Sequence, residues 1–303
     1  MQLFSLGLID NLTELADELR CGRYHHGPYE RFIVNDPKTR IIHKAAVRDR
    51  VVHRAVYRLL YPFFDRTFTA DSFSCRIGKG THRALERFTA LVRRQSRNHT
   101  RTVWVLKADV KKFFASIDHA VLLARLHEYV PDAGLMGLLS GIVDSFSTAQ
   151  GTGLPLGNLT SQLFCNVYMN IFDQFVKHEL KARSYVRYAD DFVLISPDRT
   201  RLEYWLAQLG AFLSDRLKLR LHPDKLWIKT LASGVDFLGW VHFPHHRVLR
   251  TSTRRRVLRA TYREHHPQAL ASYLGLLQHG STHHLRDEVL NGAAFVEVAH
   301  RDH

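Results

Sequence analysis

The chain has 303 residues, 45% hydrophobic and 24% charged, and this balance favours a folded protein over a disordered one. The length allows two or three subdomains. No run of about 18 apolar residues occurs, and the opening segment MQLFSLGLIDNLTELADEL carries acids but no basic leader. The sequence therefore argues against a membrane span and a secretory signal, and it favours a cytoplasmic protein.

The formal net charge of +14 is unevenly distributed along the chain. Residues 1–108 hold 20 Lys or Arg and 10 Asp or Glu, residues 109–240 hold 14 of each, and residues 241–303 hold 9 and 5. A neutral middle between two basic ends is typical of a protein that grips a polyanion from two sides. The three cysteines lie far apart and show no CxxC spacing, so neither a disulfide framework nor a zinc site is expected.

The first 110 residues are predicted to mix helices with strands. The spacing of Val51, Ala55, Leu59 and Phe63 predicts a helix over residues 47–64. Further helices are expected over residues 11–20 and, basic and amphipathic, over residues 81–97. Two short strands are expected within residues 29–43, around a turn at Asn35-Asp36-Pro37. The segment TVWVLKADV (102–110) is apolar and β-branched, which predicts a buried strand that ends in a carboxylate.

The remainder continues the mixture. Helices are expected over residues 119–129, 159–180 and 201–219. The segment SYVRYADDFVLIS (184–196) predicts a hairpin, and LWIKT (226–230) with VDFLGWV (235–241) predicts a second one. Beyond Arg247 the pattern is helical and basic. Strands and helices out of strict alternation predict an α+β fold.

Three acids occupy unusual positions in this pattern. Asp109 ends a predicted strand, and Asp190 with Asp191 forms the tip of a predicted hairpin. Each alone would be read as a capping residue or an ordinary turn. Together, carboxylates beside a core repel one another unless a cation lies between them. Nucleotidyl transfer uses two divalent ions roughly 3.5–4 Å apart, and oxygen ligands suit Mg²⁺. The acids therefore predict a site for two Mg²⁺ ions, with Mn²⁺ as a substitute.

Several segments resemble the motifs of reverse transcriptases. LKADVKKFFASIDH (106–119) is similar to motif A, and RYADDFVLI (187–195) to the Y-x-D-D box of motif C. Five motifs in order are far more specific than one. The other similar segments are GLPLGNLTSQ (153–162, motif B), HPDKL (222–226, motif D), VDFLGW (235–240, motif E) and the finger segments VRDRVVHRAV (47–56) and SFSCRIGKGTHRAL (72–85).

The resemblance covers roughly residues 25–290 and implies a right-hand polymerase fold. Residues 1–108 would form an N-terminal segment and fingers. Residues 109–240 would form a palm of antiparallel sheet plus helices, with a motif B finger segment at about 145–165. Residues 241–303 would form a short helical thumb and a tail. The implied activity is RNA-directed DNA polymerisation from dNTPs on a primer–template hybrid.

Motif B indicates a subfamily. Most reverse transcriptases carry QGxxxSP there, whereas this chain has Leu156 in place of the Gln and Gln162 in place of the Pro. That pattern resembles the reverse transcriptases of diversity-generating retroelements. These copy a template-repeat RNA into cDNA with errors opposite adenine, for mutagenic retrohoming. They need a structured retroelement RNA and a basic, homopentameric accessory variability protein, and they are encoded by bacteria or phages.

The resemblance also implies roles for individual residues. Asp109, Asp190 and Asp191, with the carbonyl of Val110, would hold the metal ions. Lys225 would protonate the leaving pyrophosphate, although an exposed lysine is the plain alternative. Phe114 would exclude the ribose 2′-OH, with Phe113 in the core. The other expected nucleotide-binding residues are Arg48, Arg76, Lys79, Leu156, Gly157 and Gln162, and the expected nucleic-acid-binding residues are Tyr188, Gly239, Arg254, Arg255 and Arg256.

Other interpretations stay open from the sequence. A retron or group II intron reverse transcriptase of ordinary fidelity would share most motifs, but motif B disfavours it. An inactive polymerase-like RNA-binding module would be expected to lack an active-site acid, and all three are present. A basic scaffold protein would explain the charge but not the motifs.

Overall fold

The computed structural model describes residues 6–35, 39–264 and 267–299, without the side chains of residues 263–269 and 292–299. The chain divides into two compact units. The first comprises Met1–Arg87, Lys107–Leu194 and Glu203–Trp227, and the second comprises Phe88–Leu106, Ile195–Leu202 and Ile228–His303. None of the described helices is both long enough and apolar enough to cross a bilayer. The division into fingers, palm and thumb stays a prediction.

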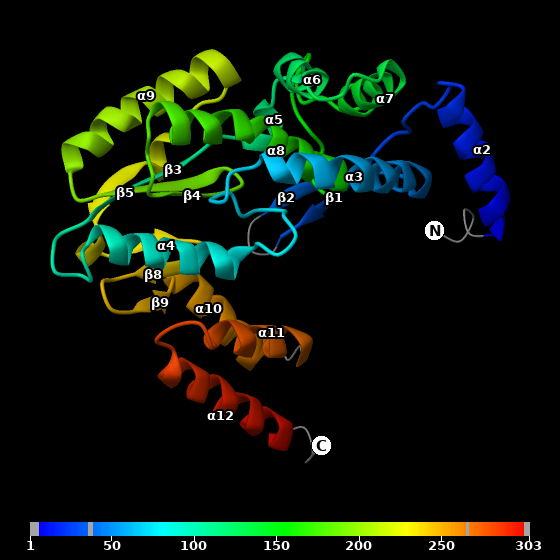
Figure 1. Ribbon diagram of the computed structural model, residues 1–303. Coiled ribbons are helices and arrows are strands. Elements are labelled where there is room, and N and C mark those ends of the chain that lie inside the picture. The colour runs from blue at the N-terminus through cyan, green and yellow to red at the C-terminus, as the bar shows by residue number, and fades with distance from the viewer. Residues whose placement is uncertain (1–5, 36–38, 265–266, 300–303) are drawn as a thin grey trace. The chain divides into compact units, whose positions relative to one another are not determined.

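Strands form three sheets (Figure 1). A two-stranded sheet pairs β1 with β2, a four-stranded sheet has the order β4-β5-β3-β6, and a three-stranded sheet has the order β7-β8-β9. The predicted turn at Asn35-Asp36-Pro37 between the first two strands lies largely outside the described residues. The strands are β1 (Glu30–Val34), β2 (Arg40–Lys44), β3 (Trp104–Asp109), β4 (Tyr185–Tyr188), β5 (Asp191–Ser196), β6 (Trp227–Thr230), β7 (Val235–Phe237), β8 (Trp240–His242) and β9 (Arg247–Leu249).

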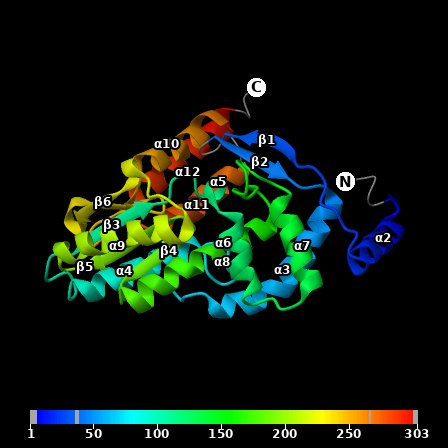
Figure 2. The ribbon, with the colours of Figure 1, turned by 90° about the horizontal axis from the view of Figure 1, so that it is seen from above.

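Helices make up most of the rest (Figure 2). The predicted helices over residues 11–20, 47–64, 81–97, 119–129, 159–180 and 201–219 are all present within a few residues. The helices are α2 (Leu8–Arg20), α3 (Val47–Thr67), α4 (Thr81–Gln95), α5 (Phe113–Ser116), α6 (His119–His127), α7 (Ala133–Asp144), α8 (Leu159–Gln174) with the π-turn η1 (Phe175–Glu179), α9 (Arg199–Leu217), α10 (Thr251–Arg259) with η4 (Ala260–Glu264), α11 (Pro267–Leu277) and α12 (His283–Ala299).

Helix α8 is the centre of the first unit's core. Phe164, Tyr168 and Phe172 on this helix are buried. The ring of Phe172 lies 5.0 Å from that of Phe192 on β5, a spacing typical of packed aromatic pairs. Helix α3 packs against α8, but its inward face carries Val52, Val56, Leu60 and Phe64. The predicted spacing therefore located the helix correctly, while Leu59 and Phe63 within it are exposed.

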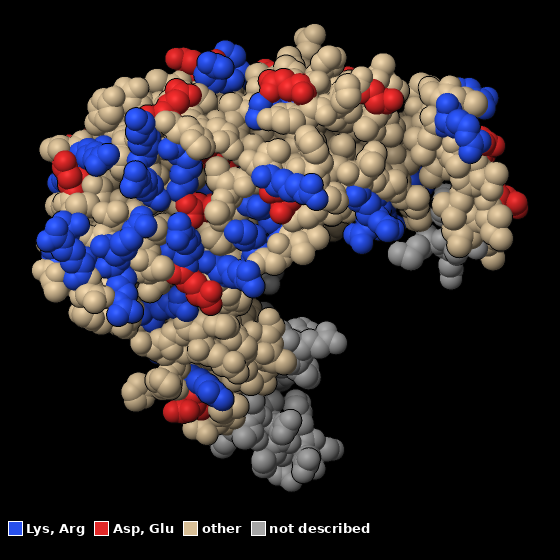
Figure 3. All heavy atoms as spheres, in the orientation of Figure 1, with Lys and Arg blue, Asp and Glu red and all other residues tan. Residues whose placement is uncertain are grey.

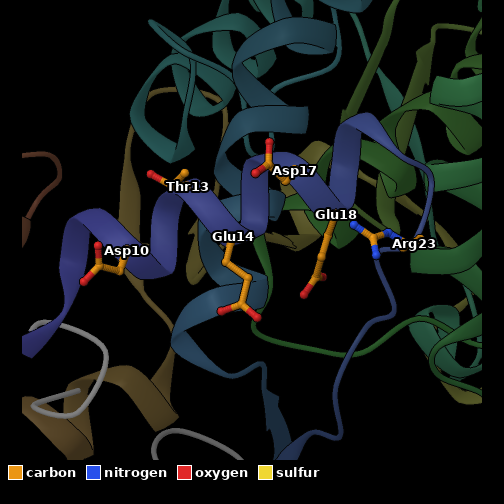
Figure 4. A pocket seen from close by; sticks show the side chains of 6 residues that line it. All are labelled: Asp10, Thr13, Glu14, Asp17, Glu18 and Arg23. Atoms are coloured by element: carbon orange, nitrogen blue, oxygen red, sulfur yellow. The ribbon is translucent and has the colours of Figure 1, made fainter.

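Helix α2 is acidic, although the chain as a whole carries a net positive charge. A shallow hollow on it is lined by acidic side chains together with Thr13 and Arg23 (Figure 4). Leu15 is the buried residue of the helix, and Ile9 is 80% exposed. The acidic residues of the hollow are Asp10, Glu14, Asp17 and Glu18.

The second predicted hairpin is wrong in its pairing. Strand β6 joins the four-stranded sheet, and the hairpin lies wholly within residues 235–242, as β7 and β8. The short helical turn Leu231–Ser233, followed by Gly234 with a φ of 84°, breaks the expected pairing. The chain then reverses at Leu238 and Gly239, whose φ values are 50° and 87°. Two consecutive positive φ angles are the geometry of a tight hairpin turn.

A buried histidine makes stability depend on pH. His53 on α3 contacts Thr160 through Nδ1 at 2.5 Å and His26 through Nε2 at 2.9 Å. Burial, followed by the neighbouring His26, lowers the pKa of His53 from 6.5 to about 4, against an opposing effect of Asp49. The unfolded chain therefore takes up a proton below pH 6.5 while the folded chain does not, so folding stability falls as the pH drops from 6.5 towards 4.

We expect His53→Gln to flatten this acid dependence. The full effect of the wild-type group is about 3 kcal/mol in the free energy of unfolding at or below pH 4. Urea unfolding at a series of pH values measures the slope, and His127→Gln, at an exposed position on α6, is the control. An unchanged slope between pH 6.5 and 4.5 in the His53 variant would contradict the assignment.

Candidate active site

Asp109 stands at the end of β3, whose Val105, Leu106 and Ala108 are buried. The chain beyond it pairs with the segment that precedes Lys225. His222 N donates to Asp109 O at 2.8 Å, and Lys111 N donates to Arg220 O at 2.8 Å. This backbone pairing brings the predicted motif D to the predicted motif A, although more than a hundred residues separate them.

The turn between β4 and β5 holds the other two acids. Tyr188 pairs with Asp191, so Ala189 and Asp190 alone form the turn, and Ala189 has a φ of 55°. Val110 N donates to Asp190 O at 3.2 Å. This hydrogen bond ties the turn to the end of β3, and it places the two acidic segments side by side.

A buried ion pair supports the same turn from beneath. Arg187 on β4 is 1% exposed and binds both oxygens of Asp173 on α8, at 2.8 and 2.6 Å. It also donates to Ala189 O at 2.9 Å and to Ser72 Oγ at 2.9 Å, and Tyr185 donates its hydroxyl to Asp173. Burial opposes the charge of Arg187, but the Asp173 carboxylate more than offsets that and raises its pKa. The guanidinium thus fixes the backbone from which Asp190 projects.

Two lysines face the carboxylates. Lys225 Nζ donates to Asp109 Oδ1 at 2.8 Å, and Lys107 Nζ lies 3.2 Å from Asp191 Oδ2. Asp191 Oδ1 is buried and has no hydrogen-bond partner among the described residues. The described residues contain no group of three His, Cys, Asp or Glu side chains already placed to hold one metal ion, and two of the three carboxylates face lysines.

The electrostatics of the site favour a bound cation. Burial, and then the charge of Asp109, raises the pKa of Asp190, while Lys225 and Arg40 lower it. Burial also raises the pKa of Asp191 to about 7, although Lys107 opposes that shift. Carboxylates that resist ionisation in a bare site become better accommodated when a cation lies among them. The donor set, all oxygen, fits Mg²⁺ or Mn²⁺.

The predicted motif B lies against the β1–β2 hairpin. His43 N donates to Leu156 O at 2.9 Å, and Asn158 Nδ2 donates to His43 O at 2.7 Å. Gly157 has a φ of 110°, and a Cβ there would lie 2.7 Å from a methyl carbon of Ile42. Close approach to β2 is therefore one reason for glycine at this position, beside the predicted approach to the nucleotide.

The aromatic pair after Asp109 divides as expected in burial. Phe113 is 3% exposed and belongs to the core, whereas Phe114 is half-buried. Phe114 O accepts from Leu154 N at 2.8 Å, which joins the predicted motifs A and B. Gln162 is half-buried in the first turn of α8. The roles of Phe114 and Gln162 towards a nucleotide stay predictions.

Three of the predicted nucleotide-binding cations have protein partners instead of the aspartates. Arg48 binds Glu18 and covers the ring of Tyr24. Arg76 donates to Asp65 Oδ1 at 2.7 Å and to three backbone carbonyls, and Lys79 donates to Ala70 O at 2.8 Å. Among the described residues, none of the three forms an ion pair with Asp109, Asp190 or Asp191, and their contact with a triphosphate stays a prediction.

The residues predicted to bind nucleic acid are spread over both units. Tyr188 accepts a hydrogen bond from Thr81 at 3.3 Å in the first unit. In the second unit, Gly239 O accepts from Arg250 N at 3.0 Å, and Arg254 lies 3.7 Å from Glu288. Arg255 is exposed, while Arg256 is half-buried. Lys and Arg side chains also gather over α4, the helix predicted to be basic (Figure 3).

Sequence reasoning missed Lys107, Arg40 and the Arg187–Asp173 pair. Lys107 precedes Asp109 by two residues, so strand alternation already placed both side chains on one face. No comparable signal indicated that Arg187 would find Asp173, because that contact depends on how α8 packs beneath β4.

Comparison with known proteins agrees with this geometry. Residues 34–242 match the family described as reverse transcriptase (RNA-dependent DNA polymerase). The chain belongs to the reverse transcriptase family. Its relatives include Protein YkfC of Escherichia coli, 29% identical over 80% of this chain and 72% of that protein. The group II intron-encoded protein LtrA of Lactococcus lactis is 21% identical over 76% of this chain and 49% of that protein.

Solved structures confirm the right-hand polymerase fold of this reverse transcriptase. Apo telomerase from Candida tropicalis covers 89% of the chain with a TM-score of 0.59 at 10% identity. The aligned chain spans 57% of that telomerase and about half of LtrA. The predicted α+β class is confirmed, and the relatives of the chain include group II intron-type proteins such as LtrA. The retroelement subtype stays a prediction from motif B.

Proposed function

We propose that this reverse transcriptase copies an RNA template into error-prone cDNA, as an enzyme of a diversity-generating retroelement would. One observation supports the polymerase activity. The hydrogen bond from Val110 to Asp190 joins the end of β3, and with it Asp109, to the Asp190–Asp191 turn. The observation that carries the low-fidelity part is Leu156 in motif B, held at β2 by its carbonyl.

The chain's own residues would divide the work of nucleotidyl transfer. Asp109, Asp190, Asp191 and the carbonyl of Val110 would hold two Mg²⁺ ions, which activate the primer hydroxyl and stabilise the leaving pyrophosphate. Lys225 would leave Asp109 when a metal ion binds there, and its ammonium group would then be free to donate a proton to pyrophosphate. The charge of Arg40 lowers the pKa of Asp190, and this arginine would add positive charge for the triphosphate.

Leu156 supplies a physical reason for low fidelity. A Leu side chain cannot donate or accept a hydrogen bond, so a polar contact that positions the nascent base pair would be missing. Contacts of this kind contribute about 1–3 kcal/mol to discrimination. We expect Leu156→Gln to lower the error frequency opposite template adenine by about tenfold. Sequencing of the primer-extension products measures this error frequency. Leu154→Gln is not a suitable control because Leu154 is buried.

A matched control for that variant is Leu159→Gln, a half-buried position at the start of α8 within the same motif. Errors opposite adenine that stay unchanged in Leu156→Gln, or that fall equally in the control, would contradict the assigned role of Leu156.

The proposed partners follow from the subtype. They are a template-repeat RNA within a structured retroelement RNA, the cDNA primer–template hybrid, dNTPs and a homopentameric accessory variability protein. The second candidate is a group II intron-type reverse transcriptase of ordinary fidelity, which the similarity to LtrA favours. The two make different products from the same assay.

The deciding experiment is primer extension on an RNA template with dNTPs and Mg²⁺, followed by sequencing. Template-directed cDNA with errors concentrated opposite adenine would support the proposal. Accurate cDNA would support the intron-type alternative. A complete lack of product, even with the cognate RNA and accessory protein added, would contradict both and indicate an inactive RNA-binding module.

A further inference from the structure

Lys107 is a half-buried cation beside the carboxylate of Asp191. It lies on β3, and β5, which begins at Asp191, is the neighbouring strand. The ammonium group of Lys107 lies 3.2 Å from Asp191 Oδ2, and the two side chains are only 12% and 19% exposed. Lys107 and Asp109 share one face of the strand because side chains alternate along it.

The two oxygens of Asp191 have different surroundings. Oδ2 faces Lys107, whereas Oδ1 is buried without a partner among the described residues. A buried polar atom without a hydrogen-bond partner destabilises the folded protein, and it indicates a group that a ligand would satisfy. Since Lys107 holds Oδ2, Oδ1 is the oxygen left for a cation.

The lysine at Asp109 is held differently. Lys225 ends a short helical turn, and its side chain is 43% exposed, so it can withdraw into solvent when a metal ion binds. Lys107 is anchored in the middle of β3 and enclosed, so it stays beside Asp191. A cation that stays reduces the formal charge of the three carboxylates from −3 to −2.

We propose that Lys107 is a positioning residue that restricts Asp191 to coordination through one oxygen and weakens the affinity of the site for divalent ions. Without its charge, the carboxylates attract a cation more strongly, and Asp191 is free to turn and bind it with both oxygens. The inference rests on the proposed function in one respect, namely that Asp191 binds a metal ion.

Mn²⁺ binding to the full chain without nucleic acid tests this directly, with the free Mn²⁺ signal measured by electron paramagnetic resonance. We expect Lys107→Met to tighten Mn²⁺ binding about tenfold. Lys107→Arg keeps the charge and is expected to bind as the wild type does. Lys111→Met removes an exposed charge two residues beyond Asp109. This control measures the effect of a nearby solvent-screened charge, and we expect it to change Mn²⁺ affinity by less than about twofold.

A double-mutant cycle then isolates the contact. In an Asp191→Asn background, Lys107→Met is expected to tighten Mn²⁺ binding clearly less than in the wild type, because only the charge of Lys107, and no longer its hold on Asp191, is then removed. In primer extension, Lys107→Met is expected to lower both the half-saturating Mg²⁺ concentration and kcat. Lys107→Gln serves the same purpose if circular dichroism shows that the Met variant is unfolded.

The outcomes separate the two claims. Wild-type chain that binds Mn²⁺ through Asp109 and Asp190, with unchanged affinity in folded Lys107→Met or Lys107→Gln, overturns the role of Lys107 and leaves the proposed polymerase intact. Equal tightening in the Asp191→Asn background also overturns it. Wild-type chain without an Asp190-dependent Mn²⁺ site overturns the proposed metal chemistry and the role of Lys107 together.

Discussion

Primer extension by an Asp190→Asn chain is expected to fall at least about a thousandfold below that of the wild type. Asp190 sits in the turn that Val110 N ties to β3, and burial with the neighbouring Asp109 raises its pKa. An amide in its place cannot supply the negative charge that a divalent ion requires. A loss of about 4 kcal/mol in transition-state stabilisation corresponds to this factor.

Single-turnover extension with saturating dNTP and Mg²⁺ measures the effect. Asp215→Asn, at an exposed position of α9, removes the same charge elsewhere and should retain activity within about twofold. Urea unfolding of the Asp190 variant should show stability at least equal to that of the wild type, because a half-buried carboxylate whose ionisation is opposed by burial and by Asp109 has been removed. Activity within tenfold of wild type in a folded Asp190→Asn chain would refute the assignment of this acid to the reaction.

Replacement of Arg187 by Met is expected to lower the free energy of unfolding by about 3–5 kcal/mol. The substitution leaves Asp173, which is 0% exposed, as a buried carboxylate without its guanidinium. Ser72 Oγ and Ala189 O lose a donor as well. A buried ion pair adds little net stability when it is intact, but the loss of one partner is severe because an unpaired charge remains.

The matched control is Arg20→Met on α2, where the partner Asp17 is 2.6 Å away and the two side chains are 75% and 52% exposed. That change should cost less than about 1 kcal/mol. Urea denaturation of both variants gives the comparison. Similar small losses at the two sites would show that the Arg187 pair does not support the fold of the turn.

The sequence predicted the strands that carry the acids, but it did not predict all of the neighbouring helices and strands. TVWVLKADV was found because it is an apolar, β-branched run that ends in a carboxylate, and SYVRYADDFVLIS because two β-rich arms flank an Asp-Asp turn. Helix α7 (Ala133–Asp144) was missed because its three glycines and almost continuous apolar pattern give a weak helical signal. Strand β9 was missed because three residues carry too little periodicity to be recognised.

The pairing of strands was predicted less well than their positions in the sequence. The hairpin expected from residues 226–241 was wrong because both segments read as strands, and local sequence does not say which strands are neighbours. In the structure, Arg48, Arg76 and Lys79 each bind another part of the protein. Their predicted contact with the nucleotide therefore remains a prediction.

The sequence by itself determined the α+β class, the positions of Asp109, Asp190 and Asp191, and membership of the reverse transcriptase family, because these depend on local patterns and motif order. Only the tertiary structure decided that Lys225 and Lys107 face the carboxylates, that Arg187 and Asp173 hold the turn, and that motif B lies on β2. Such contacts join residues far apart in the chain. Their geometry follows from the packing of helices and strands around a shared core, which no local pattern encodes.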